Sequence, residues 1–341
     1  MRIAPAARSV TVAACALAAA SSAASEVENV PALEHRVTVG DKRALNFVCM
    51  GKGSPVVVFE NGLGDGITTW QKVQSPVSKI TTACTYDRAG SGFSDPPLGP
   101  VTAEAIADDL HVLLARAGIA SPVVLVGHSA GGLYATVYAD IYLSSVAGIV
   151  LVDPSFADQD RTFANIQSEF DDAEAEENNG YKKCEVLARA QKIIPGGADE
   201  RLPPIRPDRP AAYYDYLKHM RLNPNYWQTV RLENKSISAN GGAEANDSSE
   251  ENRLHRDFGS LPLTVLTAGN FHTGLASDVG DVAAGHERTW RSGHDDLARR
   301  STRGQSSVVL NSSHYIQIDQ PQAVINAIQD VVAQARAGSI R

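Results

Sequence analysis

The sequence predicts an α/β fold with a mostly parallel, eight-stranded sheet flanked by helices. Short runs rich in Val, Ile and Leu alternate with longer stretches whose apolar residues recur every three or four positions. The first pattern is typical of buried parallel strands and the second of amphipathic helices, so the alternation indicates repeated strand–helix units. Between 155 and 260 the alternation stops, and the chain becomes polar and helical with proline breaks. We therefore predict one domain, formed by 25–154 and 261–341, with a helical cap inserted after its sixth strand.

The individual elements follow from the same patterns. Strands are predicted at 35–39, 43–50, 55–60, 81–86, 122–127, 147–152, 262–268 and 306–310. Helices are predicted at 67–80, 102–117, 131–142, 285–301 and 321–336. The helix at 102–117 is the clearest, because Ile106, Leu110 and Leu113 fall on one face and Gly118 follows its last turn.

Composition and charge limit the classes of function. The chain has 341 residues, of which 43% are hydrophobic and 21% charged, so it has enough apolar sequence for a substantial core. Its formal net charge is −8 at pH 7. An acidic chain is repelled by phosphate backbones and anionic lipid surfaces, so nucleic acid and such membranes are not expected as partners.

The first residues have the pattern of a secretory signal peptide. Arg2 and Arg8 precede the apolar run 10–20, and the small residues 22–24 provide a cleavage site before Ser25. The run is too short to span a membrane as a helix. We expect 1–24 to be a signal peptide, the protein to be periplasmic or secreted, and no segment to span a membrane.

A serine motif carries the strongest functional signal. Gly127-His128-Ser129-Ala130-Gly131 follows the apolar run 122–126 and precedes a helical stretch. A serine at a sharp strand-to-helix turn is held out over the end of the sheet, and flanking glycines accept the tight backbone that a Cβ would block. The start of the helix also presents free N–H groups to developing negative charge. Ser129 is therefore a candidate nucleophile, with a Gly/Ser-rich turn of no chemical role as the alternative.

A candidate base follows near the C-terminus. A serine hydroxyl is a weak nucleophile unless a base accepts its proton. His314 lies on a loop between the strand predicted at 306–310 and the C-terminal helix. Ser129 precedes His314 with room for an acid between them, which fits the order serine, acid, histidine. We predict that His314 is the base for Ser129.

With these residues the chain resembles the α/β-hydrolase family over most of its length. Asn61-Gly62-Leu63-Gly64 resembles the oxyanion loop of the family, 86–94 resembles the end of its next strand, and 319–321 resembles the segment after its histidine. Many members carry His-Gly where this chain has Asn61-Gly62. Since the loop of the family contributes a backbone N–H, this difference does not remove the oxyanion hole. The resemblance implies donors at the N–H groups of Leu63 and Ala130.

The acid is the least determined member of the site. In most of the family it follows the strand after the cap, but here that strand is followed by 269–272, which contains no carboxylate. A minority of the family carries the acid one strand earlier, and the corresponding strand here ends in Asp153-Pro154. We favour Asp153 as the partner of His314, with Asp278 as the alternative and Asp281 after it. A purely structural role for Asp153, as a cap of the turn into proline, is the other interpretation.

These parts imply a serine hydrolase that cleaves a small-molecule carboxylic ester through a Ser-His-Asp triad and an acyl-enzyme, without an organic cofactor or a metal. Peptidase, lactonase, thioesterase and perhydrolase activities use the same parts. A receptor that binds a small molecule without turnover, or an acyltransferase, would keep the same fold. Aromatic residues of the cap are candidates to line an apolar acyl pocket, although helix packing explains them equally well. They are Tyr213, Tyr214, Tyr216, Tyr226 and Trp227.

The four cysteines bear on the cellular compartment. Cys15 would leave with the signal peptide, unless it marks a lipoprotein signal with an unusually short apolar segment. In the fold that the chain resembles, the strands with Cys49 and Cys84 are neighbours, which implies a disulfide in an exported protein. Two buried thiols are the alternative, and Cys184 is then left over. No CxxC motif or spaced His/Cys cluster indicates a metal site.

Other polar residues near the motifs receive no catalytic role. Asp87-Arg88 lies at a strand end, where the resemblance favours a structural turn. His128 and His272 have neither a paired base nor metal-ligand spacing, so both are interpreted as bystanders.

Overall fold

The computed structural model describes residues 34–40, 42–119, 122–159, 167–193, 211–237, 246–270 and 280–338, without the side chains of 167–177 and 280–286. The predicted signal peptide, Cys15, His272 and Asp278 lie outside the described residues, and the Asp281 side chain is not described. Among the described helices, none combines the length and the apolar character needed to cross a membrane.

An eight-stranded sheet forms the centre of the molecule, with the strand order β1-β2-β4-β3-β5-β6-β7-β8. The β1–β2 and β2–β4 pairs are antiparallel, and all other pairs are parallel, which confirms the predicted sheet. The strand predicted at 55–60 begins only at Val57, because Pro55 has no N–H for the ladder. The strands are β1 (Arg36–Gly40), β2 (Arg43–Met50), β3 (Val57–Glu60), β4 (Ala83–Tyr86), β5 (Val123–His128), β6 (Val146–Val152), β7 (Leu263–Ala268) and β8 (Gly304–Val309).

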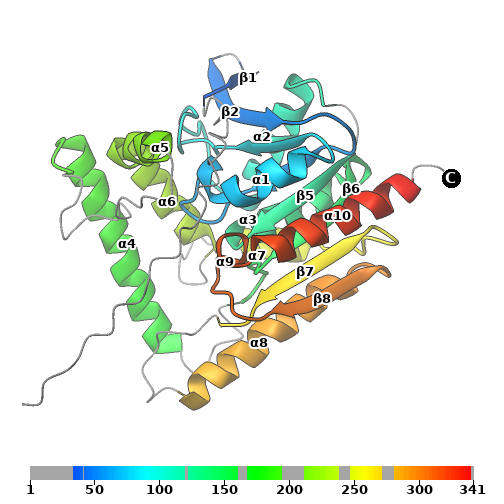
Figure 1. The fold of residues 1–341 in the computed structure, drawn as a ribbon. Helices are drawn as coiled ribbons and strands as arrows, with labels where there is room; N and C mark the ends of the chain where they lie inside the picture. The colour runs from blue at the N-terminus through cyan, green and yellow to red at the C-terminus, as the bar shows by residue number, and fades with distance from the viewer. Residues whose placement is uncertain are drawn as a thin grey trace, which may run out of the picture. The chain divides into compact units, whose positions relative to one another are not determined.

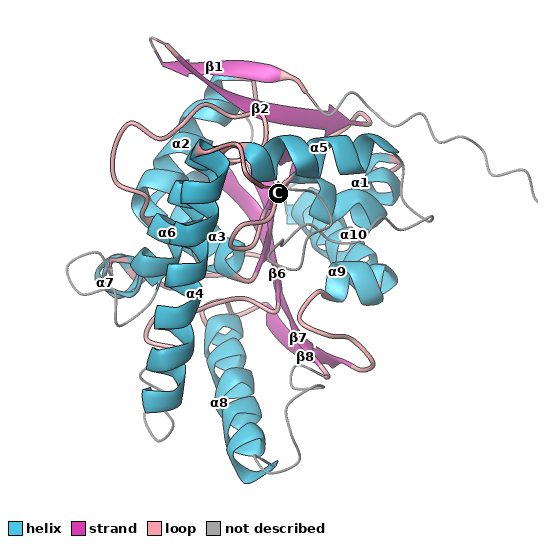
Figure 2. Cartoon of the chain, turned by 90° about the vertical axis from the view of Figure 1, so that its left-hand side faces the viewer, coloured by secondary structure: helices cyan, strands magenta, loops and turns pink. Residues whose placement is uncertain are grey.

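Helices cover both faces of the sheet (Figure 1). One apolar cluster joins the sheet to α2 (Ala103–Arg116), α3 (Ala130–Ile141) and α8 (Gly280–Arg299). The other joins it to α1 (Gln71–Ser78) and α10 (Pro321–Gly338). In Figure 2, α3 and α8 lie on one side of the sheet and α9 and α10 on the other.

The side chains of β5 show why two clusters form. Val123 and Leu125 belong to the cluster with α3, whereas Val124 and Val126 belong to the cluster with α10. Successive residues of a strand point to opposite faces, so a continuous apolar run is buried on both. The apolar run before Ser129 therefore reflects a central strand.

Two helical segments differ from the prediction. The helix predicted at 67–80 divides into a 3-10 turn, η1 (Ile67–Trp70), and α1. The Ile67 N–H donates to Asp87 Oδ1 at 3.2 Å, and the Thr69 N–H donates to Gly66 O at 3.0 Å. The second bond joins residues three apart, so the first turn is a 3-10 turn, which is tighter than an α-helical one. The short helix α9 (Ile316–Asp319) was not predicted, because one turn is too short to show a period.

Between β6 and β7 the described residues form α4 (Gln167–Arg189), α5 (Ala211–Leu222), α6 (Pro224–Ile237) and α7 (Asp247–Leu254). We call the chain between β6 and β7 the insertion. Its own apolar cluster contains Tyr216, Tyr226 and Trp227 and reaches Ile67 of the sheet domain. These aromatic side chains are 1–2% exposed, so they pack between helices and do not line an open pocket.

A disulfide joins Cys49 of β2 to Cys84 of β4. The two residues are register partners on antiparallel strands. Cys184 is buried within the apolar cluster of the insertion. Because β4 leads directly into Asp87 and Arg88, the cross-link anchors the strand that carries them.

Candidate active site

Ser129 occupies the sharp turn between β5 and α3. Its backbone has φ 54° and ψ −126°, a conformation that residues with a side chain rarely adopt. The turn leaves no room at its glycines: a Cβ on Gly127 would lie 2.3 Å from Gly131 O. A Cβ on Gly131 would lie 2.4 Å from Asn61 O. The glycines of the motif are therefore required by close backbone approach, and Ser129 is the residue that the turn presents.

Backbone hydrogen bonds tie the Ser129 turn to the end of β6. The Ser129 N–H donates to Val152 O at 3.2 Å, and the Ser155 N–H donates to Ser129 O at 2.9 Å. These bonds flank Asp153 in the sequence. The turn with Ser129 and the turn with Asp153 are thus fixed beside each other at the carboxyl edge of the parallel strands, where ligands bind in open α/β sheets.

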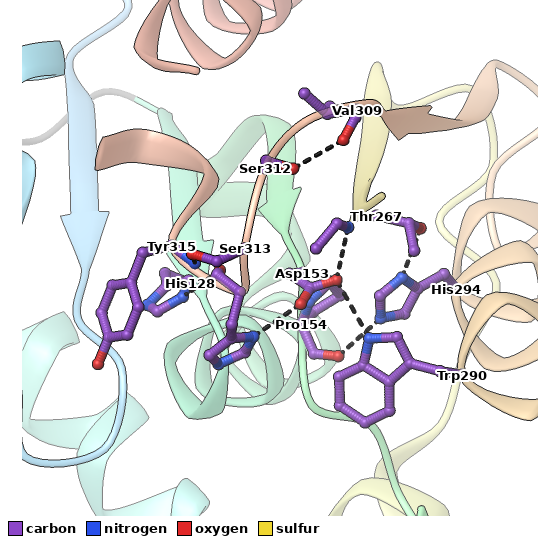
Figure 3. Close-up of polar contacts among 12 residues, drawn as sticks. His128, Asp153, Pro154, Thr267, Trp290, His294, Val309, Ser312, Ser313 and Tyr315 are labelled. Carbon is purple, nitrogen blue, oxygen red and sulfur yellow. Dashed lines mark hydrogen bonds and ion pairs between the residues drawn. The ribbon is translucent and has the colours of Figure 1, made fainter. Parts of the chain in front are cut away.

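Asp153 is the carboxylate that contacts His314. It is buried, and its Oδ2 lies 2.7 Å from His314 Nδ1, while the His314 side chain is 27% exposed. Asp153 Oδ1 accepts hydrogen bonds from the Ala268 N–H at 2.9 Å and from Trp290 Nε1 at 3.1 Å (Figure 3). The structure therefore joins two of the predicted residues, with the acid at the end of β6.

The surroundings of Asp153 favour its charged form. Burial on its own would raise the pKa of this carboxyl. The hydrogen bond from His314, the electrostatic attraction of the adjacent His314 and the Ala268 N–H more than offset burial, so the pKa of Asp153 lies below its ordinary value. An ionised Asp153 accepts the Nδ1–H of His314, which makes Nε2 the basic nitrogen of that ring.

Helix α8 supports the acid from the side opposite His314. Trp290 and His294 lie one helical turn apart on α8 and approach Asp153 and Pro154 together (Figure 3). His294 Nε2 lies 2.9 Å from Pro154 O, and its Nδ1 lies 2.6 Å from Thr267 Oγ1. Because a carbonyl can only accept, Nε2 carries the proton and Nδ1 accepts from the threonine hydroxyl. Burial lowers the pKa of His294, which agrees with a neutral ring.

His128 supports the loop that carries His314. Its ring is buried, and its Nε2 lies 3.0 Å from the backbone O of His314. On the other side, Nδ1 lies 3.6 Å from Asp65 Oδ2. Asp319 holds the same loop by accepting hydrogen bonds from the Ser313 N–H at 2.8 Å and its hydroxyl at 2.6 Å. His128 is thus a structural neighbour of His314, a role that the sequence did not indicate.

The two predicted oxyanion donors lie on different elements. Ala130 is the first residue of α3, so its N–H is among those that a helix leaves without an intrahelical acceptor. Leu63 lies in a turn that the Asp65 N–H closes onto Gly62 O at 3.2 Å. Asn61 anchors the start of this loop, because its Nδ2 donates to Tyr86 O at 2.6 Å.

Asp87 and Arg88, predicted as a structural turn, are both buried. Asp87 accepts hydrogen bonds from Asn46 Nδ2 at 2.8 Å and from the Phe93 N–H at 3.1 Å, and also from the Tyr216 hydroxyl of the insertion. Burial raises the pKa of Asp87, partly offset by these donors. Arg88 pairs with Glu60 and with Glu233 of α6. The turn therefore also connects the sheet domain to the insertion.

The sequence also matches a family model with the fold described above. Residues 55–321 match the family model of the alpha/beta hydrolase fold. The chain belongs to the α/β-hydrolase family. Among solved structures, this hydrolase is similar to a putative lipase from Acinetobacter baumannii, with a TM-score of 0.61 and 16% identity over 89% of this chain and 92% of that one. A thermophilic esterase from Thermogutta terrifontis gives a TM-score of 0.57 and 21% identity, over 89% of this chain and 99% of that one. At these identities the likeness shows the fold alone.

The curated relatives do not define an activity for this hydrolase. A probable transporter, efuK, of Hormonema carpetanum is 38% identical over 105 residues, which make up 30% of this chain and only 15% of that protein. The uncharacterized protein YqjL of Bacillus subtilis is 23% identical over 282 residues, 82% of this chain and 85% of that one.

The residues that surround the predicted catalytic residues Ser129, Asp153 and His314 were not identified from the sequence. Trp290 and His294 share one face of α8, and this spacing of aromatic residues was the available signal. For the pairing of Arg88 with Glu233 no local signal exists, because the partners belong to segments far apart in the chain. Within the described residues, no group of three or more His, Cys, Asp or Glu side chains is arranged to hold a metal ion.

Proposed function

We propose that this α/β-hydrolase is a serine hydrolase that cleaves a small-molecule carboxylic ester through an acyl-enzyme. The hydrogen bond between buried Asp153 and His314, beside the strained turn of Ser129, is the observation that carries the proposal. A nucleophilic serine requires a base that a carboxylate orients in this way. Solved structures with the same fold, described as a lipase, an esterase and an enol-lactonase, are compatible with this class of reaction.

In the proposed first half-reaction, Ser129 Oγ attacks the ester carbonyl while His314 Nε2 accepts the hydroxyl proton. Asp153 stabilises the imidazolium that forms. The N–H groups of Leu63 and Ala130 receive the oxyanion, and each such donor contributes about 3 to 4 kcal/mol to transition-state stabilisation. His314 then protonates the departing alkoxide, which leaves as the alcohol, and Ser129 carries the acyl group.

In the second half-reaction, His314 takes a proton from water as the water attacks the acyl carbonyl. The same two N–H groups receive the second oxyanion. Collapse of the tetrahedral intermediate returns the proton to Ser129 and releases the carboxylic acid. These steps use side chains and backbone of the chain itself, and the proposal requires no organic cofactor or metal.

The proposal extends to the organisation and location of the chain. It divides the sequence into a signal peptide (1–24), a hydrolase domain (25–154 and 261–341) and a helical cap (155–260), and it places the mature protein in the periplasm or outside the cell. The disulfide between Cys49 and Cys84 supports export, because disulfides form and persist in oxidising compartments. Tyr216, Tyr226 and Trp227 are packed between helices and give no support for an apolar acyl group, whereas Tyr213 and Tyr214 are half-buried, so acyl chain length is left to experiment.

The test is hydrolysis of p-nitrophenyl esters from acetate to laurate by the purified protein. We expect turnover that Ser129→Ala reduces by roughly 10⁴-fold or more. Ser155→Ala is the matched control, because it removes a hydroxyl from the same edge and keeps the backbone bond to Ser129. Turnover that survives in Ser129→Ala would overturn the proposal. Activity confined to peptides, lactones or peroxide would select one of the other reactions, and tight binding without turnover would select a receptor.

A further inference from the structure

We propose that Arg88 is a positioning residue for the oxyanion hole, and that Glu233 makes this hole depend on the position of the insertion. The inference rests on the proposed function and adds a residue to it. It comes from the hydrogen bonds of one buried guanidinium, which link the oxyanion loop, strand β3 and helix α6.

Arg88 holds the peptide unit that supplies the proposed Leu63 donor. Its Nη2 donates to Gly62 O at 2.8 Å, and its Nη1 donates to Asn61 O at 2.5 Å. The carbonyl of Gly62 and the N–H of Leu63 belong to the same planar peptide group, in which the two point in opposite directions. Fixing the carbonyl therefore fixes the direction of the N–H. A charged donor also makes this hydrogen bond stronger than a neutral one would be.

Two carboxylates in turn hold the guanidinium. Glu60 Oε1 accepts from Nη1 at 2.9 Å, and Glu233 accepts from Nε and from Nη2, both at 2.9 Å. The three side chains are at most 4% exposed. The guanidinium also lies over the Tyr134 ring, 5.1 Å from its centroid. Each of the five N–H groups of Arg88 thus has an acceptor, which a lysine could not reproduce.

A second buried arginine shows what a purely structural cluster looks like in this protein. Arg300 is also 4% exposed and pairs with two acids, Asp140 and Glu251. Its Nε and Nη2 also donate to the backbone O of Arg256. None of these partners lies in the oxyanion loop or next to Ser129. The two arginines are equally buried and each pairs with two acids, so a difference between them in catalysis points to the contact with the loop.

Helix α6 connects the insertion to the loop at two points. Glu233 holds Arg88, and Tyr226 donates its hydroxyl directly to Gly64 O at 2.8 Å. A displacement of α6 would remove the bidentate partner of Arg88 and the hydroxyl on Gly64 together. The Gly62 carbonyl would then be held less firmly, with the Asp65 N–H as its other donor, and the Leu63 N–H would be less well oriented. A displaced insertion would therefore weaken the oxyanion hole.

The experiment compares Glu233→Gln and Arg88→Lys with Arg300→Lys in the full chain. The measurements are kcat and KM on p-nitrophenyl butyrate, and inhibition by phenylboronic acid, whose adduct with a serine mimics the tetrahedral oxyanion. We expect both loop-side variants to lower kcat about 10- to 100-fold and to weaken the boronate by a similar factor, with KM changed less than threefold. Arg300→Lys should lower the melting temperature as much as they do, while its kcat stays within twofold.

Three results would overturn the inference. Wild-type kcat and boronate affinity in folded Glu233→Gln and Arg88→Lys would overturn the inference and leave the proposed function standing. Equal losses of kcat in all three arginine and glutamate variants would reduce Arg88 to a structural residue and also overturn it. If Arg88→Lys does not fold, Glu233→Gln carries the test, since it changes a single atom and keeps one acceptor oxygen. Absence of ester turnover in the wild type would overturn the proposed function and this inference with it.

Discussion

The two sides of Ser129 are held in different ways. On the acid side, a single buried carboxylate, Asp153, receives neutral donors from β7 and α8. On the oxyanion side, an arginine and two acids form a charged cluster that crosses into the insertion. The acid side belongs wholly to the sheet domain, whereas the oxyanion side depends on α6. The contacts of Asp153 thus stay within the sheet domain, whereas the loop around Leu63 also contacts a second part of the chain.

The acid side and the oxyanion side also differ in how their buried charges are compensated. Asp153 has no arginine or lysine among its described partners, and hydrogen bonds together with the adjacent His314 outweigh burial and keep its pKa low. Arg88 is 4% exposed and pairs with both Glu60 and Glu233, so removing its charge leaves two buried carboxylates uncompensated, which costs several kcal/mol. The acid side should therefore lose function when hydrogen bonds are removed, and the oxyanion side when charges are.

The largest effect is expected when the acid side is broken at its centre. Asp153→Asn keeps the size of the side chain but no longer fixes the protonated Nδ1 of His314. We expect kcat to fall by about 10⁴-fold while the fold is retained, as steady-state kinetics and circular dichroism would show. A kcat within tenfold of wild type would mean that another carboxylate, such as Asp278, completes the site.

A smaller effect is expected when the Trp290 donor to Asp153 is removed. Trp290→Phe deletes the N–H that reaches Asp153 Oδ1 at 3.1 Å and keeps most of the ring volume. Losing a donor to the ionised form leaves the charge of Asp153 less stabilised beside the imidazolium that forms on His314. We expect kcat to fall about tenfold, on the order of a hydrogen bond to a charged group. A kcat equal to that of the wild type would show that the indole N–H does not act on Asp153.

The disulfide offers a change on the oxyanion side that should affect stability and leave chemistry intact. Replacing both Cys49 and Cys84 by serine removes the disulfide between these register partners, which anchors β4 ahead of Arg88. We expect the free energy of unfolding to drop by about 2 to 4 kcal/mol in denaturant titrations. At temperatures where the variant is folded, kcat should match the wild type. A kcat loss there would mean that the cross-link also sets the position of the oxyanion loop.

The smallest effect concerns a buried acid of the insertion that has no cation beside it in the described residues. Burial raises the pKa of Asp247 to about 7 from its ordinary value of 3.8. The folded state then binds more protons than the unfolded state between these values, so this group's contribution to stability is lost as pH rises toward 7. Asp247→Asn cannot titrate, and its unfolding free energy relative to wild type should increase from pH 4 to pH 8. A constant difference across this range would contradict the shift.

The sequence allowed the sheet, the layers and the turn at Ser129 to be predicted because their signals are local. Strand runs, glycines at a close approach and the chain order of Ser129 and His314 can all be read within short windows. The position of Asp153 came from a resemblance, since the residues alone left Asp278 open. The catalytic roles of Ser129, His314 and Asp153 stay predictions, although the structure does join the last two.

The supporting contacts could not be predicted, for a physical reason. The hydrogen bonds of Trp290 to Asp153 and of Glu233 to Arg88 join segments that only the folded chain brings together. Neither partner carries a motif, because an indole on a helix and a glutamate on a helix are ordinary residues there. The packed position of Tyr216 and Tyr226 was equally open until their neighbours were known.

Intact-mass spectrometry after brief exposure to p-nitrophenyl acetate tests directly whether Ser129 is acylated with the help of His314 and Asp153. We predict one added acetyl group on the wild type, mapped to Ser129. We expect no adduct on Ser129→Ala and a much slower adduct on Asp153→Asn. Hydrolysis with the acetyl group on another residue, or an equal rate of acetylation in Asp153→Asn, would contradict this prediction.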